Sequence, residues 1–472
     1  AMQRREFLEL TGSALVAPAL QQTAQLPEPP RLDGSLAYDG VSLQAAATDG
    51  GGFTQRLPRV VLKPGSVDDM ARMVSYANHH RLTVAMRGRG HSVYGQSLAP
   101  RGIVIDSRSL GAVRMVGKTL EAEAGASLGD AARTALDAGF ALPVMSPCTM
   151  LSVGGFLSVG GESLGTRRHG AFVDQVAELD VVTGTGQLVT CSATQEPDLF
   201  DLVLAGMGQC GIIVRARLWV LPAPAQTATR TLTYSSLESF VHEQMRLATD
   251  LRIDHVSGQI LPGPGGSWRF LTTVTTLGVE GPAPDPADWL QEYSPRHLSD
   301  LTRSPYRSYL LGAEPPSAAA ARDGDPAPQV LHPQPSLAVW LPARAGHELI
   351  RILLATPRAT AGVTSMLCRA LPTGVFHRPL FRVPEEATML AFWLRRAVVP
   401  GQGSSLEFQL DANARFLERA LALGAKRYPP YGGAASPADW RKHYGENLYR
   451  QLGAAKRRYD PRNVLTPGVR IF

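Results

Sequence analysis

The hydrophobic pattern in the first half of the chain predicts short strands that alternate with helices. Val60–Leu62 and Leu82–Met86 form apolar runs of strand length, and the stretch between them has helical character. Ser66 stands where an N-cap is expected, with Asp68 and Asp69 in the first helical turn. The predicted order is therefore strand, turn, helix and strand, and a glycine loop follows the second strand.

The next apolar runs continue this alternation. "GIVIDSRSL" at 102–110 predicts another strand, and "SLGDAARTALDAGFALP" at 127–143 predicts a helix that ends at Gly139. A glycine-dense stretch covers 154–170. Within 176–192 a Gly-Thr-Gly turn joins two β-rich runs, which predicts a hairpin.

A change in composition after the first 225 residues predicts a second folding unit. From 226 to 414, β-rich segments alternate with loops rich in proline and glycine, such as "ILPGPGGS", whereas 415–472 is helical. This pattern predicts an α+β protein with an N-terminal domain at 55–225, an inserted domain at 226–414 and a returning C-terminal segment. At 472 residues the chain is long enough for two cores.

The overall composition narrows the function classes. A hydrophobic content of 44% and a charged content of 19% are typical of a globular chain. The formal charge of +6 is spread without a basic stripe, which argues against a nucleic-acid partner. The cysteines show no CxxC pair and no His/Cys ligand spacing, so we expect neither a zinc site nor a disulfide scaffold; they are Cys148, Cys191, Cys210 and Cys368. No metal ion is expected.

The first 30 residues have the features of a twin-arginine export signal. "MQRREFLELTGSALVAPAL" contains paired arginines, a short apolar stretch and an Ala-Pro-Ala cleavage motif. The apolar stretch is far shorter than the roughly 20 residues that span a bilayer, so it is no stable membrane anchor. We therefore expect a periplasmic or extracellular protein; an amphipathic first helix is the alternative.

One glycine loop carries the strongest chemical signal. "VAMRGRGHSVYGQS" at 84–97 places His91 directly after Gly88-Arg89-Gly90. Glycine tolerates positive φ and close backbone approach, so this turn can present N–H groups to a pyrophosphate. It is not a Rossmann fingerprint, because Val93 occupies the place of the third glycine. On these residues alone, an ordinary tight turn is an equal alternative.

The loop resembles the FAD-attachment loop of the vanillyl-alcohol-oxidase superfamily, and most closely that of the cytokinin dehydrogenases. Segments beginning at Gly154, Asp198 and Asp439 are similar to further segments of that family in the same order, and the likeness is thin between about 230 and 410. The resemblance implies a PCMH-type FAD-binding domain of two subdomains, completed by the C-terminal segment. It also implies an inserted α+β substrate domain whose antiparallel sheet is flanked by helices.

The same resemblance assigns residues to the cofactor. It implies that His91 is bonded to the 8α-methyl group of FAD. The residues expected to hold the pyrophosphate and the ring system are Gly88, Arg89, Gly90, Ser92 and Gln96. Those expected to line or close over the cofactor are Ser152, Gly154, Gly155, Ser158, Ile213, Tyr428 and Thr466.

Two departures from the cytokinin dehydrogenases and one additional residue bear on the substrate. The proton-accepting aspartate of that family falls on Pro147, and a glutamate of its substrate domain falls on Ser257. Cytokinin is therefore not the predicted substrate. Cys148 stands six residues before Gly154, a spacing that resembles the berberine-bridge-enzyme-like oxidases, in which such a cysteine bonds to flavin C6. This predicts a flavin held by two bonds; a small core cysteine is the alternative.

Several side chains are candidates for the group that accepts the substrate proton. They are Tyr428, Tyr431, Glu162, His255 and Glu407. Each has an alternative reading: the tyrosines pack in a proline-rich turn, Glu407 is an outward strand position, and Glu162 and His255 are solvated polar positions.

Three functions follow from these residues. The first is an exported FAD oxidase that removes a hydride from an alcohol or amine carbon of a small secondary metabolite, with O2 as acceptor. The second is a cytokinin-dehydrogenase-like amine dehydrogenase that uses a quinone-type acceptor. The third is a flavin-loaded binding protein that protects its host from a redox-active compound. We expect a monomer or homodimer with a small-molecule substrate.

Overall fold

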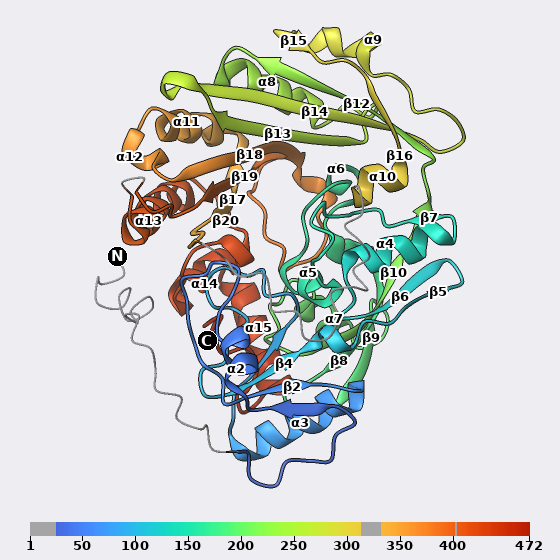
Figure 1. Cartoon of the computed structure of the whole chain (residues 1–472), viewed down its shortest axis with the longest axis vertical. Helices are drawn as coiled ribbons and strands as arrows, with labels where there is room; N and C mark the ends of the chain where they lie inside the picture. The colour runs from blue at the N-terminus through green and yellow to red at the C-terminus, as the bar shows by residue number, and fades with distance from the viewer. Residues whose placement is uncertain (1–24, 313–331, 402–403) are drawn as a thin grey trace.

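The described chain folds into two halves, with a broad sheet in the upper one and two smaller sheets in the lower one (Figure 1). A two-stranded sheet of β7 (Phe140–Ala141) and β11 (Leu221–Pro222) is added to these. This computed structural model describes residues 25–312, 332–401 and 404–472. The paired arginines and the Ala-Pro-Ala motif of the expected export signal lie outside the described residues.

The first sheet of the lower half holds the predicted strand–helix–strand unit. Its strand order is β1-β2-β4-β3, and β2 and β3 both run parallel to β4. Ser66 caps the helix by accepting the Asp69 N–H at 3.3 Å, as the sequence predicts. The elements are β1 (Ser35–Ala37), α2 (Gly40–Ala46), β2 (Val60–Lys63), α3 (Val67–His80), β3 (Val84–Arg87) and β4 (Ile103–Asp106). The first strand is thus β1, which lies before Val60 in a segment where the sequence predicted no element.

The second sheet of the lower half is antiparallel, with the order β5-β6-β10-β8-β9. The predicted hairpin is confirmed as β8 and β9, and the predicted helix before Gly139 is confirmed as α4. The strands are β5 (Val113–Val116), β6 (Thr119–Glu123), β8 (Val176–Val182), β9 (Leu188–Ser192) and β10 (Ile212–Trp219). The helices packed beside them are α4 (Leu128–Asp137), α5 (Val153–Val159) and α7 (Pro197–Val203).

The upper half is built on one antiparallel sheet with the order β15-β12-β14-β13-β18-β19-β17-β20, and β16 pairs with β12. Its helices share one hydrophobic core with the sheet; they are α8 (Leu237–Leu247), α11 (Ala343–Leu354) and α13 (Leu406–Ala422). The strands nearest the lower half are β13 (His255–Pro262), β17 (Leu337–Pro342), β18 (Val363–Pro372) and β19 (Thr388–Arg396). The outer strands are β12 (Gln226–Tyr234), β14 (Trp268–Gly278), β15 (His297–Leu298) and β16 (Thr302–Pro305).

The C-terminal segment passes from the upper half to the lower half. The boundary predicted between 414 and 415 lies inside α13, because that helix continues to Ala422 on the core of the large sheet. Strand β20 (Lys426–Arg427) then pairs with β17. The chain crosses only afterwards, and α14 (Pro437–Tyr444) and α15 (Glu446–Tyr459) pack into the core of the lower half. No helix among the described residues is long and apolar enough to cross a bilayer.

Candidate active site

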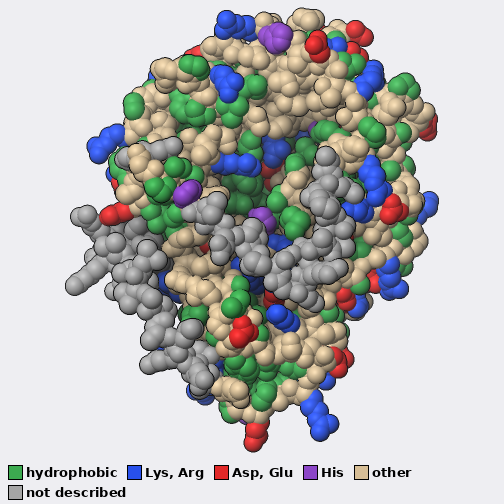
Figure 2. Space-filling model, in the orientation of Figure 1, with side chains coloured by type: hydrophobic (Ala, Val, Ile, Leu, Met, Phe, Trp, Pro, Cys, Tyr) green, Lys and Arg blue, Asp and Glu red, His purple; other side chains and the backbone are tan. Residues whose placement is uncertain are grey.

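A cavity of about 840 Å³ lies where the two halves meet. Its wall comes from the glycine loop after β3, from the segment 146–164, from the lower face of the large sheet and from the turn at 428–431. The space-filling view shows a hollow on this face of the molecule, with Lys and Arg side chains at its edge (Figure 2). Segments far apart in the sequence therefore build one site.

The glycine loop has the geometry of an anion cradle. Gly90 has a φ of +71°, a conformation that L side chains rarely adopt. The N–H groups of residues 89–93 donate no hydrogen bond to any other described residue, and Nε of Arg89 is buried without a partner. Unpartnered amide donors beside an arginine suit the pyrophosphate of a dinucleotide. The residues present therefore fit the phosphates of FAD.

Asp49 holds this loop in place, which the sequence gave no reason to expect. Its carboxylate accepts the Gly95 N–H at 2.6 Å and the Gly51 N–H at 3.1 Å, and the Gly50 N–H bonds to the Ser92 carbonyl at 2.8 Å. Burial raises the pKa of Asp49 to about 6, against these hydrogen bonds and the nearby Arg87. The carboxylate thus ties the His91 loop to the preceding segment.

The glycine-dense segment meets the loop at the start of α5. Ser152 caps α5 by accepting the Gly155 N–H at 3.3 Å, and a Cβ on Gly88 would lie 2.0 Å from its hydroxyl oxygen. The Ser158 hydroxyl donates to the Gly154 carbonyl at 2.7 Å. Both serines line the cavity, but their hydroxyl groups hold the backbone of α5. Their main role is to shape the wall.

Other predicted cofactor residues also reach the cavity. Ile213 and Ser92 line it, and the Thr466 hydroxyl donates to the Gly208 carbonyl at 3.1 Å. Nε2 of Gln96 donates to the Pro429 carbonyl at 3.2 Å, which connects the glycine loop with the C-terminal turn. The wall is therefore closed by the C-terminal segment.

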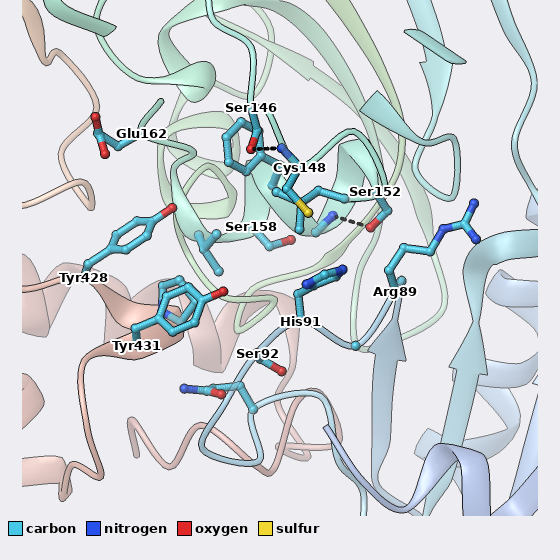
Figure 3. Close-up of a pocket in the computed structure, with 18 of the residues that line it drawn as sticks. Arg89, His91, Ser92, Ser146, Cys148, Ser152, Ser158, Glu162, Tyr428 and Tyr431 are labelled. Carbon is cyan, nitrogen blue, oxygen red and sulfur yellow. Dashed lines mark hydrogen bonds between the residues drawn. The ribbon is translucent and has the colours of Figure 1, made fainter. Parts of the chain in front are cut away.

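His91 and Cys148 face the same part of the cavity (Figure 3). Burial lowers the pKa of His91, with Arg89 and Arg87 acting in the same direction, so the ring is neutral near pH 7. Burial raises the pKa of the Cys148 thiol, whose backbone N–H donates to Ser146 Oγ at 3.1 Å. The other three cysteines, Cys191, Cys210 and Cys368, are buried in the core, as the sequence predicts.

Aromatic rings form the wall beside the C-terminal turn. The Trp393 ring lies 4.9 Å from Tyr431 and 5.5 Å from Tyr428, centroid to centroid. Burial raises the pKa of both phenols, that of Tyr431 to about 12. Both hydroxyl groups are therefore protonated at neutral pH. They can donate hydrogen bonds, but they are poor proton acceptors there.

Glu162 is the acidic side chain of this wall. Its side chain is 0% exposed, and Oε2 accepts from Nη2 of Arg369 at 2.7 Å. Its second oxygen, Oε1, is buried and has no hydrogen-bond partner in the described part of the chain. Burial raises the pKa of Glu162, although Arg369 opposes the shift. In Figure 3 Tyr428 lies below Glu162, and the Glu162 carboxylate points away from Cys148 and His91. Among the described lining residues, Glu162 is the only carboxylate.

Comparison with known proteins places this site in a family. A family model described as "FAD binding domain" matches residues 58–192, and one described as "Cytokinin dehydrogenase 1, FAD and cytokinin binding" matches 377–472. Cytokinin dehydrogenase 9 of Oryza sativa subsp. japonica is 30% identical over 93% of this chain and 91% of its own length. The chain belongs to the PCMH-type FAD-dependent oxidoreductases that include the cytokinin dehydrogenases.

Two further matches extend over most of the chain. "Uncharacterized oxidoreductase ORF5 in fasciation locus" of Rhodococcoides fascians is 28% identical over 92% of this chain and 98% of its own length. The crystal structure of 6-hydroxy-D-nicotine oxidase from Arthrobacter nicotinovorans superposes with a TM-score of 0.69 at 20% identity, covering 93% and 98% of the two chains. The predicted α+β, PCMH-type fold is thereby confirmed.

Two of the candidate proton acceptors lie outside the cavity wall of this FAD-dependent oxidoreductase. His255 is buried beside Tyr309, with Nδ1 at 3.0 Å from its hydroxyl oxygen, and burial lowers the pKa of the ring to about 3. Glu407 is exposed in the first turn of α13, because Ser405 caps a helix where a strand was predicted. The structure therefore brings neither His255 nor Glu407 to the described cavity wall.

The positions that depart from the cytokinin dehydrogenases do line the cavity. Pro147 and Ser257 are both part of its wall. Neither carries a carboxylate, and the carboxylate of the described wall is that of Glu162, which pairs with Arg369 of the large sheet. The described residues hold no group of three or more side chains suited to a metal ion.

Proposed function

We propose that this FAD-dependent oxidoreductase is an oxidase that acts on an alcohol or amine carbon of a small molecule and uses O2 as acceptor. The observation that carries the proposal is the unpartnered, buried Oε1 of Glu162 in the wall of the cavity that holds the glycine cradle. A buried acceptor without a donor is costly. A substrate O–H or N–H would supply that donor once the side chain turns toward the cavity, from which its oxygens are closed off.

The roles of the side chains follow from their protonation. FAD would supply the two-electron redox chemistry when bound, so that the hydride from the substrate C–H bond and the proton from the adjacent O–H or N–H together reduce O2 to H2O2. Glu162 accepts the proton from the adjacent O–H or N–H, because its raised pKa lies closer to neutrality than that of an ordinary carboxyl. Arg369 keeps the carboxylate in place. Tyr431 and Trp393 pack against the substrate and exclude water.

The proposal includes a covalently held cofactor. A ring nitrogen of His91 would bond to the 8α-carbon of FAD, and the Cys148 sulfur would bond to C6. Each new bond replaces one N–H or S–H and one C–H, so two electrons and two protons pass to O2 for each attachment. Support comes from the placement of both side chains at one part of the cavity (Figure 3). A covalent bond would keep the cofactor in a protein that is exported by way of its paired arginines.

Two measurements on the purified protein test the proposal. Precipitation with acid should leave yellow colour in the pellet, because a bonded flavin cannot be washed out. A panel of alcohols and amines should then yield H2O2 in step with oxygen uptake. Release of all colour into the supernatant would contradict the covalent attachment, and turnover without peroxide would contradict the oxidase.

An amine dehydrogenase with a quinone-type acceptor is the second candidate. Its support is the match of residues 377–472 to the family model named for FAD and cytokinin binding. The two candidates differ under anaerobic conditions. A dehydrogenase would turn over with an added quinone and release no peroxide in air, whereas the proposed oxidase requires O2. Location is tested separately, by fractionating cells that make the protein with Arg4-Arg5 intact or changed to Lys-Lys.

A further inference from the structure

The floor of the cavity is one face of the large sheet. Along β18 and β19, alternate side chains point to opposite faces. Met366, Cys368 and Phe392 lie in the core under the helices, whereas Leu367, Trp393 and Arg395 line the cavity. In the strand register Leu367 stands opposite Trp393, and Ser365 stands opposite Arg395. The floor therefore has two neighbouring cross-strand pairs: Leu367 with the aromatic Trp393, and Ser365 with Arg395, which carries a guanidinium group.

Arg395 differs from the other arginines of the wall. Arg369 is paired with Glu162, and Arg396 donates to Asn413 and to the carbonyls of Ala359 and Ala361. The Arg395 side chain lines the cavity, is exposed, and makes no hydrogen bond or ion pair with any described residue. An arginine aimed into a ligand cavity without a counter-charge is suited to a planar anion.

With FAD bound, the negative charges of the cavity would be matched by groups other than Arg395. Glu162 neutralises Arg369 at a distance of 2.7 Å. The pyrophosphate of FAD belongs with the unpartnered N–H groups and Arg89 of the glycine loop. Within the described wall no other carboxylate remains for Arg395. The missing negative charge must come from a ligand or from solvent ions.

We propose that Arg395 binds a carboxylate of the substrate and that the substrate is a planar, largely apolar molecule carrying that carboxylate. This inference rests on the proposed function and names its substrate class. Arg395 lies two residues beyond Trp393 on the same face of β19. Two residues of a strand span about 7 Å, so the ring of such a substrate stacks on Trp393 while its carboxylate reaches the guanidinium group. The Ser365 hydroxyl, opposite in register, supplies a further donor.

The test compares two ligands of the same shape that differ in charge. Isothermal titration calorimetry of the purified flavin-loaded protein measures the Kd of cinnamate and of its neutral analogue, cinnamamide. We expect cinnamate to bind about tenfold more tightly, because only the carboxylate forms a charge-assisted pair with Arg395. In Arg395→Gln the Kd of cinnamate should rise about tenfold, and the Kd of cinnamamide should stay within twofold. Arg395→Lys should retain part of the preference.

Arg419→Gln is the matched control, because Arg419 is exposed in the last turn of α13 and outside the cavity wall. It should leave both Kd values unchanged. Equal affinity for the two ligands, no binding of either, or a preference for cinnamate that survives in Arg395→Gln would each overturn the proposal. The acid precipitation distinguishes failure of this inference from failure of the proposed function. A protein whose acid pellet stays yellow but which binds cinnamate and cinnamamide equally contradicts only the carboxylate site at Arg395.

Discussion

Replacing Glu162 with glutamine tests whether Glu162 accepts the substrate proton, because this substitution changes the shape of the side chain least. The variant keeps the side-chain volume and one acceptor for Arg369, but it cannot take up a proton. Loss of a general base lowers kcat/KM by about 10²- to 10⁴-fold, or roughly 3 to 5 kcal/mol of transition-state stabilisation. Because Oε1 has no partner among the residues that the structure describes and the side chain is 0% exposed, we expect a loss toward the upper end of that range.

The pH profile separates this role from a structural one. Activity requires ionised Glu162, so kcat/KM should rise as the pH rises through its pKa, which burial places above the ordinary 4.5. Glu162→Gln should remove this acidic limb. Arg369→Met should move it to higher pH, because Arg369 lowers the pKa of Glu162. Stopped-flow reduction of the flavin under anaerobic conditions measures the step without interference from the acceptor.

Both substitutions also break the buried ion pair between Glu162 and Arg369. Removing one partner of such a pair costs about 3 to 5 kcal/mol of folding stability. Thermal unfolding of each variant must therefore show a folded protein at the assay temperature. A folded Glu162→Gln protein that keeps more than a tenth of wild-type kcat/KM, with its acidic limb intact, would refute the assignment.

Three further predictions concern the same site. Tyr431→Phe should lower kcat/KM less than tenfold and leave the acidic limb of the pH profile in place, because a phenol with a pKa of about 12 stays protonated throughout the assay range. A loss as large as that of Glu162→Gln would instead assign proton transfer to Tyr431. Cys148→Ala should abolish the absorbance of a 6-thio flavin while the acid pellet stays yellow through His91, and an unchanged visible spectrum would exclude the thioether. Burial raises the pKa of Asp49 from 3.8 to about 6, so the folded state holds this proton more tightly than the unfolded state. The free energy of unfolding should therefore fall by about 3 kcal/mol as the pH rises from 3.8 to about 6. Asp49→Asn should remove that slope in urea titrations at a series of pH values, and a slope that persists would assign it to other groups.

The sequence by itself determined the local elements and the cofactor loop. Alternation of apolar residues and the Gly-Thr-Gly turn were sufficient for the β8–β9 hairpin, and Ser66 was sufficient for the start of α3. These features depend on the φ and ψ preferences and side-chain periodicity of neighbouring residues. His91 stood out by its place after a glycine turn, but its assignment to the cofactor came from the resemblance of that loop to the cytokinin dehydrogenases. Glu407 shows the limit, because "SSLEFQL" alternates like a strand yet begins a capped helix.

Only the tertiary structure decided which groups meet in the cavity. Glu162 and Arg369 are 207 positions apart, and Asp49 reaches Gly95 across 46 positions. Such pairs are brought together by the packing of the two halves, which no local spacing encodes. Arg395 is one of many arginines in the chain until the register of β18 and β19 places it in the cavity wall, where its side chain has no hydrogen-bond or ion-pair partner among the described residues. Local preferences act over a few residues, whereas register and packing act across the whole fold, so the chemistry of this site depends on the latter.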